Sequence, residues 1–117
     1  CPDGWHLPSD GEWTTLTDYL GGISVAADKL KEAGTTHWPS PNDATNESGF
    51  TALPGGYRFD YDSGANFEGI GYHCDWWSST EHNAIDAWYR GLGFNASYVG
   101  RYDNNEAFGF SVRCVRD

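Results

Sequence analysis

The sequence predicts an α+β fold, because helix signals occupy the first part of the chain and extended segments occupy the second. Ser9-Asp10-Gly11-Glu12 has the pattern of a capping box, in which a hydroxyl and a carboxylate bind free backbone N–H groups at a helix N-terminus. Extended segments are expected at 76–79, 87–94 and 108–115, separated by clusters of Asn, Gly and Asp. We therefore expect helices packed on a sheet, with long loops.

The capping box is expected to open a helix over residues 10–20. Trp13, Leu16 and Leu20 recur there at helical spacing on one face. Gly21-Gly22 follows directly and supplies the left-handed conformation in which helices commonly end. This helix is expected to pack its Trp and Leu side chains on the sheet.

A second, shorter helix is expected before Gly34. Ser24 is the expected N-cap, and Val25 and Leu30 are the expected inward side chains. Residues 35–48 are rich in Pro, Asn, Ser and Thr, whose local side-chain hydrogen bonds compete with regular structure, so a structured loop is expected there.

Apolar positions alternate in the segment 49–59 around a Pro-Gly-Gly turn, which predicts a strand on each side of the turn. Trp76 and Trp77 are adjacent and must point to opposite faces of a strand. We expect Trp77 in the core and Trp76 on a ligand-facing side.

The composition predicts one domain over residues 1–117, with an aromatic core. Only 38% of the residues are hydrophobic, but 6 Trp, 7 Tyr and 6 Phe provide large apolar surfaces. The 15 Gly and 5 Pro indicate many turns. A chain that opens directly at Cys1 is interpreted as a domain excised from a larger surface or secreted protein.

The charge balance argues against nucleic acid as a partner, because a net charge of −10, from 17 acidic and 7 basic residues, repels phosphate backbones. No apolar run approaches the roughly 20 residues that span a bilayer, so direct membrane insertion is not expected. We expect a soluble, monomeric domain.

Three cysteines, Cys1, Cys74 and Cys114, allow three single-disulfide pairings. Domain termini often lie close together, which favours the pairing of Cys1 with Cys114 and leaves Cys74 as an odd thiol. A lasting disulfide implies an oxidising compartment, so an extracellular or cell-surface location is expected.

Motifs along the whole chain carry a family resemblance. They are C-P-D-G-W-H-L at 1–7, L-P-S-D-G-E-W at 7–13, F-T-A-L-P-G-G-Y-R at 50–58, W-S-S-T at 77–80 and G-F-S-V-R-C-V-R at 109–116. The second is similar to the entry of formylglycine-generating-enzyme-like and related C-type-lectin-like domains. Together they resemble the Fibrobacter succinogenes major paralogous domain. This resemblance implies a C-type-lectin-like fold, with two helices on a twisted antiparallel sheet and adjacent termini, in secreted or surface-anchored bacterial proteins. It implies no single ligand.

Residues 82–107 resemble the variable region of proteins that are diversified by retroelements. Alternate side chains of a strand face opposite sides, so this segment should pack one face and present the other. The expected packed set is Trp88, Arg90, Leu92 and Phe94, and the expected presented set begins with Tyr89, Gly91, Gly93 and Asn95. The alternative is that 95–107 is a polar connection with Asn-rich turns.

These observations predict a non-enzymatic receptor or adhesin module whose ligand is a protein or a glycan on another surface. Tyr, Gly, Asn and Asp mixtures are also how antibody loops are composed, which suits recognition. The candidate ligand-binding residues are His73, Asp75, Asn83, Asp86, Tyr89, Gly91, Gly93, Asn95, Tyr98, Tyr102, Asp103, Asn104 and Asn105.

His73-Cys74-Asp75 places an imidazole, a thiol and a carboxylate side by side, which invites a metal or nucleophile hypothesis. In a strand, His73 and Asp75 face one side and Cys74 the other, so no three-ligand site is expected. The formylglycine-generating enzyme depends on a close pair of reactive cysteines. With Cys114 tied to Cys1, Cys74 has no partner for exchange, and no enzyme activity is expected.

Two alternatives stay open beside the binding module. One is a calcium-assisted carbohydrate lectin, although the chain has no Glu-Pro-Asn or Gln-Pro-Asp tripeptide. Asn42, Asp43, Asn46 and Glu47 offer oxygen ligands from one loop, although a solvated Asx-rich turn is favoured there and no cofactor is expected. The other is a structural paralogue that has no specific ligand.

Overall fold

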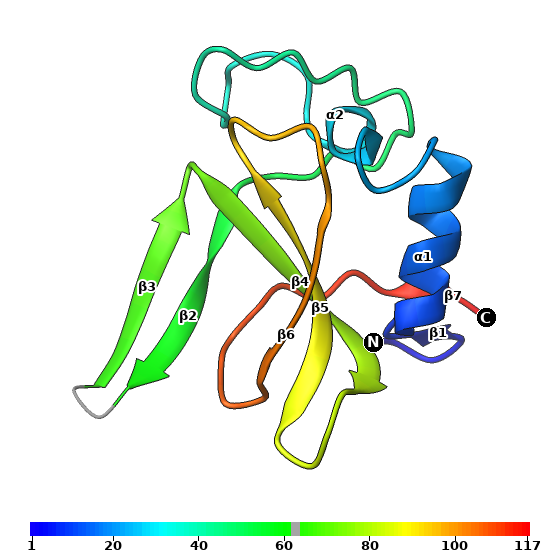
Figure 1. Ribbon diagram of the computed structural model, residues 1–117, viewed down its shortest axis with the longest axis vertical. Helices are drawn as coiled ribbons and strands as arrows, with labels where there is room; N and C mark the ends of the chain where they lie inside the picture. Colours follow the sequence, from blue (N-terminus) through cyan, green and yellow to red (C-terminus); the bar gives the residue numbers. More distant parts are fainter. Residues whose placement is uncertain (62–63) are drawn as a thin grey trace.

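A computed structural model describes residues 1–61 and 64–117 and shows two helices beside a mixed β-sheet (Figure 1). The α+β class is therefore confirmed. The elements follow the chain as β1 (Trp5–His6), α1 (Asp10–Tyr19), α2 (Ala26–Leu30), β2 (Gly55–Tyr61), β3 (Gly64–Ile70), β4 (His73–Glu81), β5 (Asp86–Gly93), β6 (Gly100–Asn105) and β7 (Val115–Arg116).

The main sheet has five strands in the order β3-β2-β4-β5-β6. Its neighbours are antiparallel except for β2 and β4, which run parallel where Gly56 pairs with Cys74. The prediction of a purely antiparallel sheet is wrong at this pair. Because β3 folds back along the outer edge of β2, β4 enters on the other side of β2 in the same direction as β2.

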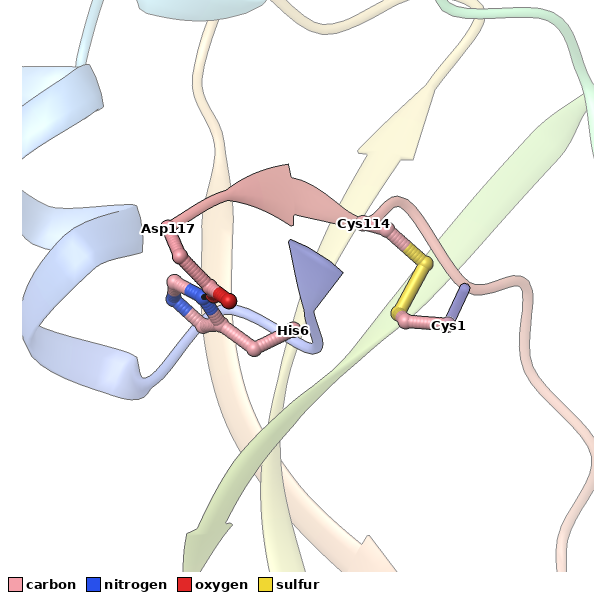
Figure 2. Close-up of a disulfide and its surroundings, with 4 residues drawn as sticks. All are labelled: Cys1, His6, Cys114 and Asp117. Carbon is pink, nitrogen blue, oxygen red and sulfur yellow. Dashed lines mark hydrogen bonds and ion pairs between the residues drawn. A yellow bond between two sulfur atoms is a disulfide. The ribbon is translucent and has the colours of Figure 1, made fainter. Parts of the chain in front are cut away.

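The two ends of the chain lie side by side (Figure 1). Trp5 pairs with Arg116 in the two-stranded sheet of β1 and β7. The predicted disulfide between Cys1 and Cys114 is confirmed, with its two Cα atoms 5.8 Å apart (Figure 2). Next to it, the His6 ring lies 2.7 Å from a carboxylate oxygen of Asp117. The disulfide thus joins segments that strand pairing already brings together.

Helix α1 forms as its sequence predicts. The Glu12 N–H donates to Ser9 Oγ at 3.2 Å, and the Ser9 N–H donates to Glu12 Oε2 at 2.8 Å, which completes the capping box. The hydrogen bond from the Ser9 backbone N–H contributes most to lowering the pKa of Glu12, to about 2. Hydrogen bonds with the His6 ring and the Ser9 hydroxyl lower it further. Trp13 and Leu20 are buried in the core.

Helix α2 differs from its prediction at the N-terminus. The helix begins at Ala26, and the N-cap is Val25, which makes no side-chain capping bond. Ser24 is therefore not the cap, and Val25, which is 45% exposed, does not point inward. Leu30 is buried as expected, and Ala26 and Ala27 are fully buried, with the Ala27 N–H donating to the Ser97 oxygen at 3.1 Å.

The strand predictions hold in part. β4 contains the segment expected at 76–79, and β5 covers 87–93 of the segment expected at 87–94. The segment 49–54 is not a strand, and 108–114 makes only isolated bridges, such as Arg58 to Gly109 and Trp76 to Ser111, before β7. Conversely, residues 100–105 form β6, which pairs in register with β5 along its length, so this part of 95–107 is a strand and not a loose polar connection.

The two adjacent tryptophans face the opposite way from the prediction. Trp76 is only 8% exposed and packs in the core against Trp13 and Phe50. Trp77 lies on the other face of β4, where its ring stacks on Phe110 at 4.3 Å. Alternation along a strand shows that the two side chains diverge, but the strand's position in the sheet decides which one meets the helices.

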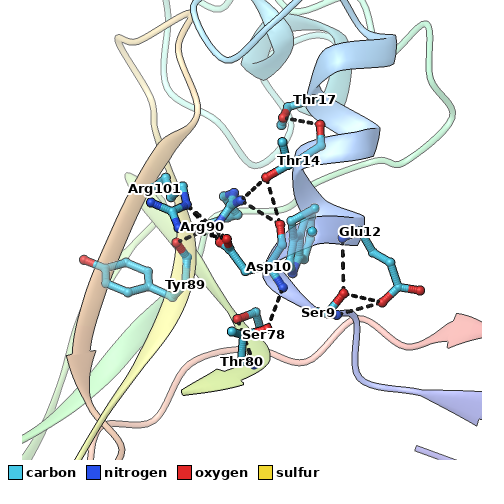
Figure 3. Close-up of polar contacts among 12 residues, drawn as sticks. Ser9, Asp10, Glu12, Thr14, Thr17, Ser78, Thr80, Tyr89, Arg90 and Arg101 are labelled. Carbon is cyan, nitrogen blue, oxygen red and sulfur yellow. Dashed lines mark hydrogen bonds and ion pairs between the residues drawn. The ribbon is translucent and has the colours of Figure 1, made fainter. Parts of the chain in front are cut away.

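A charged cluster attaches α1 to the sheet (Figure 3). Arg90, on β5, is 1% exposed and donates to Asp10 Oδ1 at 2.6 Å and to Thr14 Oγ1 at 3.1 Å. Arg101, on β6, donates to Asp10 Oδ2 at 2.9 Å, and its guanidinium lies 3.7 Å above the Trp88 ring. Burial acts to raise the pKa of Asp10, but the two arginines outweigh it and hold that pKa below its usual range.

Polar side chains of the loop at 35–48 form hydrogen bonds and an ion pair that fix its conformation. The Asn42 amide donates to the backbone oxygens of Glu32 and Gly34. The Asn46 amide donates to Thr51 Oγ1, and Glu47 forms an ion pair with Lys29 at 3.0 Å. Within 1–61 and 64–117, no three His, Cys, Asp or Glu side chains are grouped as a metal site. Neither described helix is long and apolar enough to cross a membrane.

Candidate functional site

The face of the sheet opposite α1 is built from two rows of paired residues. Trp77, Tyr89 and Tyr102 lie opposite one another across β4, β5 and β6. The next row is Asp75, Gly91 and Gly100. Figure 3 shows Tyr89 projecting away from its buried neighbour Arg90. The predicted alternation is therefore confirmed on β5 for Arg90 and Leu92, which are buried, while Trp88 is half-buried. Phe94 lies just beyond the strand and packs partly buried against the core.

An open cavity of about 560 Å³ lies over these rows, and we call it the aromatic cavity. Its volume is that of a small-ligand site. Residues from β2, β3, β4, β5 and β6, from the β5–β6 connection and from the segment after β6 line it. They are Tyr57, Phe59, Glu68, His73, Asp75, Tyr89, Gly91, Leu92, Gly93, Asn95, Ala96, Tyr98, Tyr102, Asn104, Phe108 and Phe110.

The rings of the aromatic cavity contact one another. Phe110 is central: its ring centroid lies 4.6 Å from that of Tyr89 and 6.4 Å from that of Tyr57. Tyr89 also contacts Tyr102 at 5.8 Å. Such tilted and edge-to-face contacts restrict the rings, so the wall is largely ordered before any ligand arrives. Burial, followed by the nearby charge of Asp75, raises the pKa of the Tyr89 hydroxyl to about 12.

Asp75 supplies the carboxylate of the cavity. It is half-buried, and its side chain has no hydrogen-bond or ion-pair partner among the described residues. Burial raises the pKa of this carboxyl to about 7, because the charged form loses water without gaining a counter-charge. Asp75 is thus a half-buried carboxyl group without a described partner, and it is available to bind a ligand in the largely aromatic wall of the cavity.

Glycines leave room for these side chains. A methyl group built on Gly91 would lie 2.7 Å from Asp75 Oδ1, and one built on Gly93 would lie 3.6 Å from His73 Cε1. A methyl group on Gly100 would overlap the Tyr102 ring. The Gly residues in 91–100 therefore allow the Asp75 carboxylate and the Tyr102 ring to lie flat over the strand backbone.

Most of the predicted ligand-binding residues line the aromatic cavity. These are His73, Asp75, Tyr89, Gly91, Gly93, Asn95, Tyr98, Tyr102 and Asn104. The other four lie outside its lining. Asn83 and Asp86 hydrogen-bond to each other at 2.7 Å in the β4–β5 turn, Asp103 is exposed on β6, and Asn105 Oδ1 accepts from the Ala107 N–H.

Sequence reasoning missed the far wall of the cavity, formed by Tyr57, Phe59, Glu68, Phe108 and Phe110. The patterns at 57–59 and 108–115 predicted extended segments, but they did not indicate that these segments lie beside each other. Isolated bridges from Gly109 to Arg58 of β2 and from Ser111 to Trp76 of β4 place Phe110 against Tyr57 and Tyr89.

Cys74 takes no part in the cavity. It is buried on the core side of β4, as the alternation in 73–75 predicts, while His73 and Asp75 share the cavity face. Burial, followed by the charge of Asp75, raises the pKa of its thiol far above the usual range. A thiol that stays protonated and shielded is a poor nucleophile and a poor metal ligand.

Replacing Asp75 by asparagine is expected to stabilise the protein at high pH. Since the folded-state pKa of about 7 exceeds the unfolded value, the folded state holds a proton between about pH 4 and pH 7 that the unfolded state releases. Stability therefore falls as pH rises through that window. Asp75→Asn should gain about 1–3 kcal/mol of unfolding free energy at pH 8 and almost nothing at pH 3.5. The gain at pH 8 is less than the ~4 kcal/mol that corresponds to the whole pKa shift, because solvent in the open cavity screens the charge.

Urea denaturation at the two pH values measures this gain. Asp103→Asn is the matched control, since it removes the same charge from an exposed site on β6 and should shift stability little at either pH. An equal effect of Asp75→Asn at both pH values would contradict the expectation.

The chain matches the family model of the Fibrobacter succinogenes major domain over residues 1–116. The match covers all the elements described above. Comparisons with curated proteins and with solved structures gave no significant match.

Proposed function

Because the chain belongs to the Fibrobacter succinogenes major domain family, we propose that it is a non-enzymatic binding module that receives its ligand in the aromatic cavity. The observation that carries the proposal is the cavity itself. The cavity brings Tyr, Asn and Gly residues of 89–104 together with the Asp75 carboxylate, which has no described partner, on a scaffold closed by a disulfide. Concave sites with apolar walls and a few polar groups are typical of ligand recognition.

The absence of enzyme activity is part of the proposal. Cys1 and Cys114 are consumed in the disulfide and Cys74 is buried, so no described thiol is available to act as a nucleophile at the cavity. The disulfide also supports an extracellular or cell-surface location, because such bonds persist in oxidising compartments. We propose a protein or a glycan as the ligand.

We also propose that the arrangement is C-type-lectin-like and that 82–107 is a diversified segment. Adjacent termini, two helices and a five-stranded sheet support the first point. The exposure of Tyr98 (53%) and Tyr102 (48%) supports the second, since exposed side chains can vary without cost to the core. Sequencing the DNA beside the gene tests diversification: a near-identical template repeat and a reverse-transcriptase gene are expected, and their absence would contradict it.

The double variant Tyr98→Ala/Tyr102→Ala is expected to lose ligand capture by at least about tenfold while remaining folded. Exposed tyrosines supply contact area at low entropic cost, and removing an aromatic anchor commonly costs more than 1 kcal/mol of binding energy. Tyr89 is left intact because it packs on Phe110 at 4.6 Å, and its removal would disturb the wall.

The measurement compares binding of the wild type and the variant to a glycan array and to a displayed protein library. Tyr19→Ala is the matched control, since Tyr19 is 87% exposed on α1 and does not line the cavity. The proposal is overturned if ligands selected with the wild type bind the double variant equally well, or bind Tyr19→Ala as weakly as the double variant.

A further inference from the structure

Among the described residues, Asp75 differs from Asp10 and Asp28, two other partly buried carboxylates, in having no cation beside it. Asp10 binds Arg90 and Arg101, and Asp28 lies 3.3 Å from Lys31. Around Asp75, by contrast, the residues that line the cavity include no Lys or Arg. The Lys and Arg side chains for which the structure describes an ion pair therefore lie outside the cavity lining.

Acidic and aromatic residues line the cavity together. Glu68 adds a second carboxylate to that of Asp75, and Tyr57, Tyr89 and Tyr102 contribute aromatic rings, of which Tyr89 and Tyr102 contact each other. Aromatic faces attract cations through their quadrupole, and the attraction strengthens where water is displaced. A carboxylate beside such rings is the arrangement that suits an organic cation.

A net charge of −10 acts in the same direction, because it draws basic partners toward the surface. The cavity is open and half enclosed by the two rows of the sheet and the segment 108–110, so a side chain can enter from a partner's surface without any opening of the fold. The volume and the acidic and aromatic lining both fit one extended side chain with a charged end.

We propose that the aromatic cavity binds the cationic end of an Arg or Lys side chain of a protein ligand, with Asp75 as its counter-ion and Tyr57, Tyr89 and Tyr102 around it. This inference rests on the binding function proposed above and adds the chemical class of the ligand. It assigns Gly91 a role as well, since the lack of a side chain there leaves the Asp75 carboxylate accessible.

Binding should depend on pH, because the carboxyl must be ionised to attract a cation. With a pKa of about 7, only a small fraction of Asp75 is ionised at pH 5.5, which should weaken binding about 30-fold relative to pH 8. The other titratable groups that face the same space are His73 on β4, Glu68 on β3, and the hydroxyls of Tyr57, Tyr89, Tyr98 and Tyr102. A His73→Gln variant removes the imidazole, so it distinguishes the titration of His73 from that of Asp75. Its ligand binding should keep the same pH dependence.

The test is an NMR titration of the folded domain with four probes: N-acetyl-arginine amide, N-acetyl-lysine amide, the neutral isostere N-acetyl-citrulline amide, and methyl glycosides. The cationic probes are expected to shift the amide signals of Gly91 and Gly93 at pH 8 and to bind at least about tenfold more tightly than the citrulline probe. Asp75→Asn should lose this preference, and Asp103→Asn, which removes an exposed carboxylate outside the lining, should retain it.

Gly91→Ala provides a second variant that keeps the charge, and it should also weaken cation binding because the methyl group meets Asp75 Oδ1. The inference is overturned if citrulline binds as tightly as arginine, if Asp75→Asn keeps the preference, or if glycosides alone bind at the cavity. In each of these cases the binding function still stands, because its test is separate: it fails when ligands selected with the wild type bind the Tyr98→Ala/Tyr102→Ala variant equally well, or bind Tyr19→Ala as weakly as that variant.

Discussion

Replacing Cys1 and Cys114 together by serine is expected to lower the free energy of unfolding by about 4–5 kcal/mol, the loop-entropy value for a closed loop of more than 100 residues. The two cysteines are 113 positions apart, so the bond restricts almost the whole unfolded chain. In the folded state the pairing of β1 with β7 already holds the termini together, so the folded structure itself should change little.

Urea denaturation of the double variant and of the wild type, each with and without reducing agent, measures this effect. Reduction should bring the wild type to the stability of the variant and leave the variant unchanged. A wild type that is insensitive to reductant, or a variant as stable as the oxidised wild type, would contradict the expected role of the bond. The aromatic cavity should survive in molecules of the variant that remain folded.

Replacing Asp10 by alanine is expected to cost about 3–5 kcal/mol of unfolding free energy, because it leaves a buried positive charge without its partner. Asp10 is the only carboxylate bound to the 1% exposed Arg90 among the described residues, with an N to O distance of 2.6 Å. Arg101 loses its partner as well, but it is exposed and can be hydrated. The loss should shrink as pH falls below about 4, where the carboxylate of the unfolded state takes up a proton.

A double-mutant cycle with Arg90→Met separates the charge from the packing. Met fills a similar space, and the Arg90 Nε has no hydrogen-bond partner among the described residues, so Asp10→Ala/Arg90→Met should recover most of the stability lost in Asp10→Ala. Asp103→Ala is the surface control and should stay within about 0.5 kcal/mol of the wild type. A double variant as unstable as Asp10→Ala would show that the cluster is not held by the charge pair.

Several features of this protein were predictable from local sequence because their physical cause is local. The capping box at Ser9 and Glu12 forms within four residues, and it appears in the structure as expected. The alternation in 88–95 needs only the two-residue period of a strand, which places Tyr89 and Arg90 on opposite faces wherever the strand lies. The same period places His73 and Asp75 together and Cys74 opposite them.

Other features depend on contacts between segments that are distant in the chain. Which of Trp76 and Trp77 meets the core is decided by the side of β4 on which α1 packs. The exposure of Val25 is decided by where the second helix begins. Local patterns narrow such choices to two, but they cannot select one, because both options satisfy the same local rule.

The sequence by itself predicted the helix start at Ser9, favoured the pairing of the terminal cysteines, and put Tyr89, Gly91 and Gly93 on one side of β5. Only the tertiary structure decided that β2 runs parallel to β4 and that bridges from Gly109 to β2 and from Ser111 to β4 hold Phe110 against Tyr57 and Tyr89. The physical reason is that capping and alternation act between near neighbours. The aromatic cavity, in contrast, and the isolation of Asp75 within it arise from the order in which the strands assemble.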